Sequence, residues 1–219
     1  MRLLLIRHGQ TIDNVRGALS TVVPGPPLTE LGFAQVAVLP DVLAGQPLDA
    51  IYASTALRAQ LTAEPLARAR GLQAEVIDGI QEIAAGSLEQ RTDDDAIHAY
   101  VGAVVAWRQD RSVRIPGGED GYEFFDRYTT AIEAIASRHA RDGTVAVVSH
   151  GAAIRTWASW AACNTDEEFV RTHGLDNTAV VVLEGSPSAG WVITRWAGEP
   201  VGGERLADAG ALDPTGDSS

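Results

Sequence analysis

The sequence predicts an α/β protein, a three-layer α/β/α sandwich with a mostly parallel central sheet and a helical insertion. Short apolar segments typical of buried strands alternate with longer segments of helical character. The length of 219 residues suits one domain, and 45% hydrophobic with 21% charged residues is an ordinary globular composition. Alternating strands and helices indicate parallel pairing, because each helix carries the chain back to the starting edge of the sheet.

Local signals predict the individual elements. Residues 2–6 are apolar and lead directly into charged and glycine-containing sequence, which predicts a short buried strand. Thr29 is expected to cap a helix that continues to about Ala44, with Glu30 in its first turn. Residues 144–149 form the clearest strand. The remaining expected elements are strands at 50–53, 74–77, 179–183 and 191–196, and helices at 56–70 and 152–162.

A single domain is predicted over residues 1–197. It contains a mostly helical insertion at about 88–141, which Pro116-Gly117-Gly118 interrupts. Residues 198–219 are polar and acidic, so we expect them to form a mobile tail.

Composition excludes several classes of function. A net charge of −12 without any basic stretch argues against binding to nucleic acid or to anionic membranes, and no apolar run is long enough to span a bilayer. The single cysteine, Cys163, offers neither a disulfide framework nor a thiolate cluster, and the other histidines lack the spacing of metal ligands. We therefore expect a cytoplasmic protein without metal or other cofactor. The oligomeric state is left open, with a homodimer as one option.

Two histidines follow predicted strands at the point where each strand ends. Arg7-His8-Gly9 comes directly after the first strand, and Ser149-His150-Gly151 comes after the clearest one. Arg58 lies in the first turn of the helix that follows another strand. Ligands of parallel sheets bind beyond the carboxyl ends of the strands, so these side chains are expected to meet there. The glycines let the backbone turn and bring amide groups close to a ligand.

These residue types fit phosphoryl transfer. A neutral imidazole at His8 can attack phosphorus and divide a slow hydrolysis into two easier steps. The guanidinium groups of Arg7 and Arg58 match the oxygens of a transferring phosphoryl group, and His150 can add a donor. They would also supply the local positive charge that a phosphorylated substrate needs on so acidic a protein. The leaving alkoxide requires a proton, and Glu82 is the best placed carboxylic acid because it follows the third strand.

Four motifs in this order resemble the histidine phosphatase (phosphoglycerate-mutase-like) superfamily. They are Arg-His-Gly-x-Thr-x-x-Asn at residues 7–14, a complete Ser-x-x-x-Arg-Ala-x-x-Thr-Ala at 54–63, Glu82 with a glycine four residues later, and Ser-His-Gly at 149–151. The resemblance covers residues 2 to about 184. Arg-His-Gly alone would be a weak signal, whereas four motifs in the same order are specific.

The resemblance implies a role for each residue of these motifs. His8 becomes phosphorylated, and Glu82 acts first as the acid and then as the base. The implied catalytic residues are thus His8, Glu82, His150, Arg7 and Arg58. The expected contacts of the substrate phosphate are Arg7, Asn14, Arg58, His150 and Gly151.

Departures from the family pattern favour the phosphatase branch. The mutases carry a Glu-Arg-His-Tyr-Gly segment and a long following insertion around the acid. The sequence from Glu82 to Glu89 has neither feature. Gln10 replaces a common glutamate, a change that the branch tolerates and that is not expected to affect the chemistry. Pro116-Gly117-Gly118-Glu119 resembles the Gly-Glu segment of the family that opens the late helix, and Asp120 stands where a serine is usual. We therefore expect a phosphomonoesterase acting on a small phosphorylated metabolite. The alternatives are a phosphoglycerate-type mutase and, less favoured, a non-catalytic phospholigand-binding protein on the same fold.

Some assignments have competing interpretations. Glu89 and Asp78 lie close enough in sequence to compete with Glu82 for the role of the acid. Asn14 could equally be a turn or helix-cap residue. Asp93-Asp94-Asp95 is interpreted as a solvated helix start rather than a cation site.

Overall fold

The computed structural model describes residues 1–208 and 210–216, and within them one sheet of six strands crosses the molecule. The strand order is β3-β2-β4-β1-β5-β6. The first four strands in sequence pair in parallel, and the last two are antiparallel to their neighbours. The predicted mostly parallel sheet is therefore confirmed. The strands are β1 (Arg2–Arg7), β2 (Ala50–Ser54), β3 (Ala74–Ile77), β4 (Thr144–Ser149), β5 (Val180–Ser186) and β6 (Gly190–Ala197).

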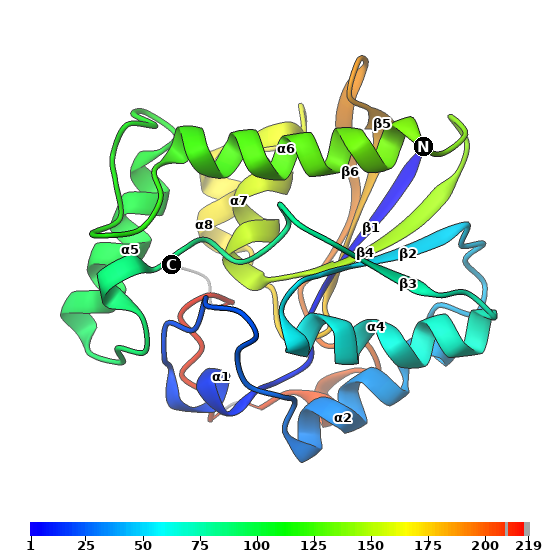
Figure 1. The fold of residues 1–219 in the computed structure, drawn as a ribbon, viewed down its shortest axis with the longest axis horizontal. Coiled ribbons are helices and arrows are strands. Elements are labelled where there is room, and N and C mark those ends of the chain that lie inside the picture. The colour runs from blue at the N-terminus through cyan, green and yellow to red at the C-terminus, as the bar shows by residue number, and fades with distance from the viewer. Residues whose placement is uncertain (209, 217–219) are drawn as a thin grey trace.

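Helices cover both faces of the sheet, which gives the three layers predicted from the sequence (Figure 1). Helices α6 and α7 lie on one face, and α2 and α4 lie on the other, while α5 extends to one side. The helix bounds are α1 (Ile12–Arg16), α2 (Glu30–Ala37), α3 (Leu39–Val42), α4 (Leu57–Arg70), α5 (Asp94–Ala106), α6 (Gly121–Ser137), α7 (Gly151–Ala161) and α8 (Glu167–Thr172).

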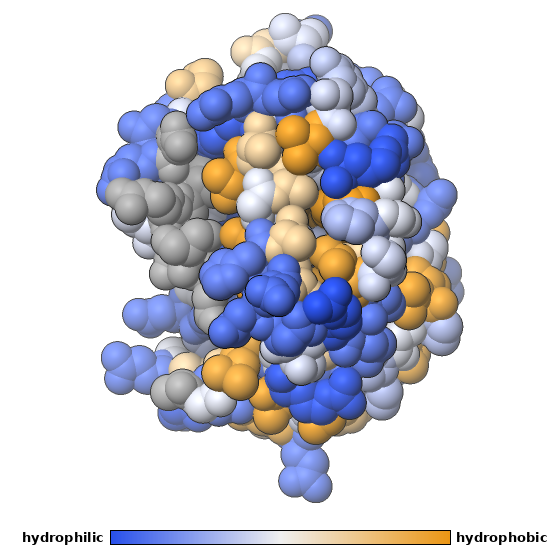
Figure 2. Space-filling view, turned by 90° about the vertical axis from the view of Figure 1, so that its left-hand side faces the viewer, coloured by the Kyte–Doolittle hydropathy of each residue, from blue (hydrophilic) through white to orange (hydrophobic). Residues whose placement is uncertain are grey.

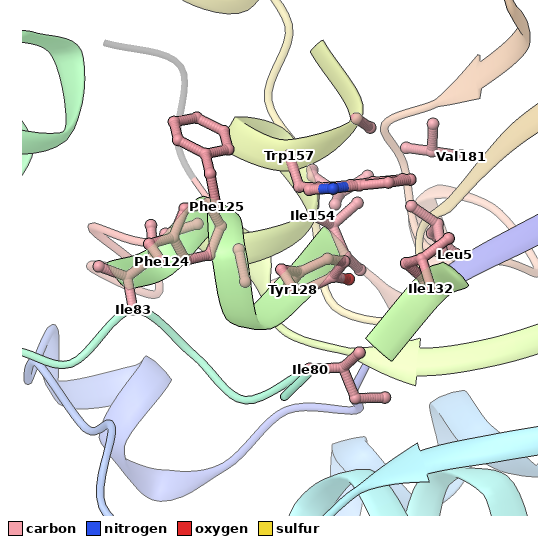
Figure 3. Close-up of a cluster of buried hydrophobic side chains, with 14 of the residues drawn as sticks. Leu5, Ile80, Ile83, Phe124, Phe125, Tyr128, Ile132, Ile154, Trp157 and Val181 are labelled. Atoms are coloured by element: carbon pink, nitrogen blue, oxygen red, sulfur yellow. The ribbon is translucent and has the colours of Figure 1, made fainter. Parts of the chain in front are cut away.

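Alternation along the central strands divides the core between the two faces. Leu3 and Leu5 of β1 pack into the cluster beneath α6 and α7, whereas Leu4 and Ile6 pack towards α2 and α4. All four side chains are buried because both faces of the sheet are covered. Figure 3 shows the first cluster, in which aromatic residues of α6 and α7 meet aliphatic residues of the sheet and of the loop after β3. Its labelled members are Leu5, Ile80, Ile83, Phe124, Phe125, Tyr128, Ile132, Ile154, Trp157 and Val181.

The helix expected from Thr29 to about Ala44 is in fact two shorter helices, and this expectation was wrong. Thr29 does cap α2, since its hydroxyl accepts the N–H of Gly32 at 3.0 Å. The chain then turns at Val38 into α3. Pro40 explains the break, because it has no N–H to donate and its ring would clash with the preceding turn of a continuous helix. Two further short helices, α1 and α8, were not predicted.

The described part of the expected tail lies against the domain. Residues 198–216, apart from 209, run back past α1, where the red part of the ribbon lies beside the blue ribbon around this helix (Figure 1). Asp213 and Thr215 are buried, and the side chain of Asn14 donates to Asp213 at 3.3 Å. Residues 210–216 are called the C-terminal segment below.

The face seen from the left of Figure 1, where α5 lies, has a strip of hydrophobic residues between hydrophilic ones (Figure 2). Val105 of α5 is one of the exposed apolar side chains of the protein. None of the described helices combines the length and apolar character needed to cross a membrane.

Candidate active site

The carboxyl ends of three adjacent strands bring the predicted site residues together. In the parallel register of β1 and β4, Arg7 lies opposite Ser149, so the two following histidines leave the sheet side by side. The rings of His8 and His150 are 5.1 Å apart, centre to centre. Arg58, from the first turn of α4 after β2, contacts both of them.

The glycine after each histidine stands where no side chain would fit. A Cβ at Gly9 would lie 2.9 Å from the side chain of Val36 in α2. A Cβ at Gly151 would lie 2.8 Å from Nε of Arg7 and 2.7 Å from the carbonyl oxygen of Thr215. The first glycine allows α2 to pack against the strand end, and the second allows the guanidinium of Arg7 to approach the start of α7.

His8 is held in the form of a nucleophile. Its Nδ1 lies 2.8 Å from the carbonyl oxygen of Gly9, which can only accept, so Nδ1 carries the proton. Nε2 therefore carries a lone pair, which accepts the N–H of Arg58 Nε at 3.1 Å. Burial holds the pKa of His8 well below its usual value, and the charges of Arg58 and Arg7 lower it further. The imidazole is thus neutral near pH 7, as attack on phosphorus requires.

His150 is fixed in the opposite tautomer. Its Nδ1 lies 3.0 Å from Nη2 of Arg58, and since a guanidinium only donates, Nδ1 is an acceptor. Nε2 then donates to the hydroxyl of Ser54 at 2.7 Å. Burial lowers the pKa of His150 well below its usual value, and Arg58 adds to this effect. His150 thus carries no proton on the nitrogen that Arg58 contacts, which differs from the donor expected from the sequence.

Two arginine nitrogens provide the elements of an anion site. Nε of Arg7 and Nη1 of Arg58 are buried and have no hydrogen-bond partner among the described residues. Both side chains are almost wholly enclosed, and burial lowers the pKa of Arg58. An unsatisfied buried donor is costly, so an anionic oxygen that accepts from it is strongly favoured.

Glu82 lies at the start of α7, next to this anion site. Its carboxylate accepts the N–H of Ile83 at 2.9 Å, of Ala153 at 2.8 Å and of Ala152 at 3.2 Å. Burial raises the pKa of Glu82, although the N–H of Ile83, the charge of Arg58 and the N–H of Ala153 counteract the rise. Its competitor Glu89 instead holds the loop at Thr21, whose hydroxyl donates to it at 2.6 Å.

An ion pair that the sequence did not reveal holds the loop that carries Glu82. Arg127 of α6 donates to the carboxylate of Glu119 at 2.6 and 2.8 Å. The same guanidinium donates to the carbonyl oxygens of Gly79, Gln81 and Glu82 at 2.9 to 3.0 Å. Glu119 in turn accepts the N–H of Ala84 at 2.7 Å. The loop is therefore fixed on both sides of Glu82. Glu119 belongs to a segment noted in the sequence, but nothing there singled out Arg127.

Asn14 has the cap geometry that was its alternative interpretation. It occupies the third position of α1, and its side-chain oxygen accepts the N–H of Thr11 at 2.9 Å in a capping box. Its amide nitrogen faces Asp213 rather than either histidine. Across the described residues, no three histidine, cysteine or acidic side chains are grouped as a metal site.

Comparison with protein families agrees with this arrangement. Residues 3–198 match the histidine phosphatase superfamily (branch 1). The chain belongs to this superfamily. The resemblance recognised from the four motifs is thereby confirmed.

Two relatives of similar sequence extend well beyond the part that matches this chain. The chain is 33% identical over 224 residues to a PE-PGRS family protein of Mycobacterium tuberculosis, covering 95% of this chain and 38% of that protein. It is 33% identical over 127 residues to the adenosylcobalamin/alpha-ribazole phosphatase of Salmonella typhimurium, covering 58% of this chain and 62% of the enzyme. The chain thus spans less than two thirds of these relatives.

A solved relative supports the same fold. The structure of a mycobacterial glucosyl-3-phosphoglycerate phosphatase in complex with VO3 superposes with a TM-score of 0.76 at 27% identity, covering 90% of this chain and 99% of that one. The match with the superfamily ends at residue 198, so the C-terminal segment lies beyond it.

Proposed function

We propose that this protein is a phosphomonoesterase that hydrolyses a small phosphorylated metabolite through a phosphohistidine on His8. The observation that carries the proposal is the tautomer of His8. Its Nδ1 proton is committed to the Gly9 carbonyl, so Nε2 presents a lone pair beside two buried arginines. Both named phosphatases among the relatives above support a phosphoester substrate.

The first step forms the bond between Nε2 of His8 and phosphorus and breaks the bond between phosphorus and the ester oxygen. Arg7 and Arg58 neutralise the charge on the three equatorial oxygens. Glu82 gives its proton to the leaving oxygen. The raised pKa of Glu82 favours this, because more of the carboxyl group carries a proton near neutral pH.

The second step returns the enzyme to its starting state. The Glu82 carboxylate takes a proton from water, the water oxygen attacks phosphorus, and the bond to His8 Nε2 breaks. Inorganic phosphate leaves, and Glu82 is again protonated. The same group thus serves as acid and base. A mutase would instead return the phosphoryl group to a second hydroxyl of its substrate, and the sequence around Glu82 favours water.

A screen of phosphorylated metabolites for phosphate release tests the activity. The His8→Ala variant should lose turnover, and acid-labile, base-stable label from a radioactive phosphoester should appear on wild-type His8 alone. His139→Ala is the matched control, since His139 precedes β4 at the opposite end of the sheet and bonds Tyr52 instead. Normal turnover in His8→Ala would refute the proposal. Interconversion of phosphoglycerates without phosphate release would favour the mutase. The cytoplasmic location stays a prediction.

A further inference from the structure

The C-terminal segment places a carboxylate on residues that were expected to bind phosphate. Asp213 forms an ion pair with Nη2 of Arg7 and accepts a hydrogen bond from the amide of Asn14 at 3.3 Å. The hydroxyl of Thr215 accepts from the same Arg7 nitrogen at 3.1 Å and donates to Asp213 at 3.0 Å. The chain itself therefore supplies an anion to the Arg7 guanidinium, although Nε of this group stays without a partner in the described part of the chain.

The site is closed in this arrangement. The exposed fractions of His8, Arg58, His150 and Glu82 are 3%, 2%, 0% and 4%. Arg7 is fully buried, and the backbone of the C-terminal segment lies directly against it, because a Cβ at Gly216 would fall 1.8 Å from Nη1. While the C-terminal segment is docked, a phosphoester cannot reach Arg7 from the side that the segment covers.

A second contact holds the chain that leads into the segment. The side-chain amide of Gln10, two residues after His8, donates to the carboxylate of Asp208 at 2.8 Å. Gln10 is buried, and its oxygen accepts from the hydroxyl of Thr29 at 2.8 Å. A glutamate at this position would keep the bond to Thr29 but set a negative charge against Asp208.

We propose that the C-terminal segment is an intramolecular inhibitor, in which the Asp213 carboxylate competes with the phosphoryl group of the substrate for Arg7. The proposal rests on the proposed function only in that the same site binds a phosphoryl group. Nη2 of Arg7 donates to both Asp213 and Thr215, so it has no hydrogen left for a phosphate oxygen while the segment is docked. The substrate therefore binds only to molecules from which the segment has moved away.

With competition of this kind, the measured affinity for phosphate equals the affinity of the open molecules multiplied by the fraction of molecules that are open. Loss of the Asp213 charge removes a charge-assisted hydrogen bond of the docked segment, so phosphate binding should tighten about tenfold or more. The coupling is reciprocal, so phosphate should also release the segment.

The test uses inorganic phosphate and the full-length protein, with the dissociation constant measured by calorimetry at constant ionic strength. We expect Asp213→Asn to bind phosphate about tenfold or more tightly than wild type. Gln10→Glu leaves Asp213 unchanged and should tighten binding about two- to fivefold, as expected for a more exposed contact. Asp142→Asn makes the same change in net charge in the exposed turn before β4 and should bind as wild type does.

A second readout follows the segment itself. In wild type, saturating phosphate should speed hydrogen exchange across residues 210–216, and in Asp213→Asn this exchange should already be fast. Equal or weaker phosphate binding in Asp213→Asn would overturn the proposal, because weaker binding would mean that Asp213 positions Arg7 for the ligand. Unchanged exchange in wild type would overturn it as well.

The experiments distinguish failure of the inhibitor proposal from failure of the proposed phosphatase activity. Tighter phosphate binding without turnover of any phosphoester would support the inhibitor and refute the phosphatase. Turnover with unchanged phosphate affinity in both variants would do the reverse.

Discussion

Removal of the Arg127 guanidinium should impair the action of Glu82 without reaching the phosphate site. Arg127 holds the Glu82 loop by three carbonyl contacts and by its pair with Glu119. In Arg127→Gln the loop loses all of these contacts, and Glu82 loses its fixed distance to the leaving oxygen. General acids contribute about 10²- to 10⁴-fold, and a misplaced acid should lose part of this, about 10- to 100-fold.

Arg127→Gln should also lower the free energy of unfolding, by an amount that depends on the burial of the Arg127–Glu119 pair. Glu119 is a buried residue, so it would be left as an enclosed charge without its partner. Breaking such a pair costs about 3–5 kcal/mol, which in a domain of this size lowers Tm by about 6–20 °C. Activity must therefore be compared well below the Tm of the variant.

The assay compares the initial burst with an alkyl phosphate and with p-nitrophenyl phosphate. An alkoxide needs a proton to leave, whereas p-nitrophenolate hardly does, so the burst should fall for the alkyl substrate and change little for the aryl one. Arg138→Gln is the matched control, since Arg138 follows the end of α6 and pairs with Glu75 through two contacts of 2.7 Å, away from the site. Equal losses with both substrates in Arg127→Gln would refute the positioning role.

Three further predictions concern the site itself. Glu82→Gln should slow the alkyl burst by about 10²- to 10⁴-fold and the aryl burst far less, and equal defects would remove the acid role from Glu82. His150→Asn should change the pH dependence of unfolding. The folded state keeps this imidazole neutral while the unfolded chain takes up a proton near pH 6.5, so stability is complete above that pH and falls below it. Denaturant titrations between pH 5 and 6.5 should show that the free energy of unfolding depends less steeply on pH in the variant, by up to about 1.4 kcal/mol per pH unit. An unchanged slope would contradict the buried neutral form of His150. Activity should survive exhaustive EDTA, because Arg7 and Arg58 supply the positive charge, and loss that a divalent ion restores would show a metal requirement.

Local sequence patterns were enough to locate the strands and the residues that end them. β1 and β4 are short apolar runs that lead directly into Arg-His-Gly and Ser-His-Gly. Parallel pairing of the two strands then places both histidines at the same end of the sheet, independently of the conformation of the loops between them. The cap at Thr29 was also readable, since capping depends on residues three apart. The break after α2 was also encoded locally, because Pro40 lacks the N–H that a continuous helix needs, and the expectation of a single helix overlooked it.

Contacts between distant residues were decided by the tertiary structure alone. The tautomers of His8 and His150 follow from a carbonyl, a guanidinium and a hydroxyl that meet only in the folded chain. Arg127 resembles any other charged residue of a helix until its contacts with the Glu82 loop are known. The C-terminal segment has the composition of a mobile tail, yet a single buried charge pair, between Arg7 and Asp213, joins residues 206 positions apart. Sequence patterns record local preference, whereas such a pair forms because a buried charge without an opposite charge beside it is costly.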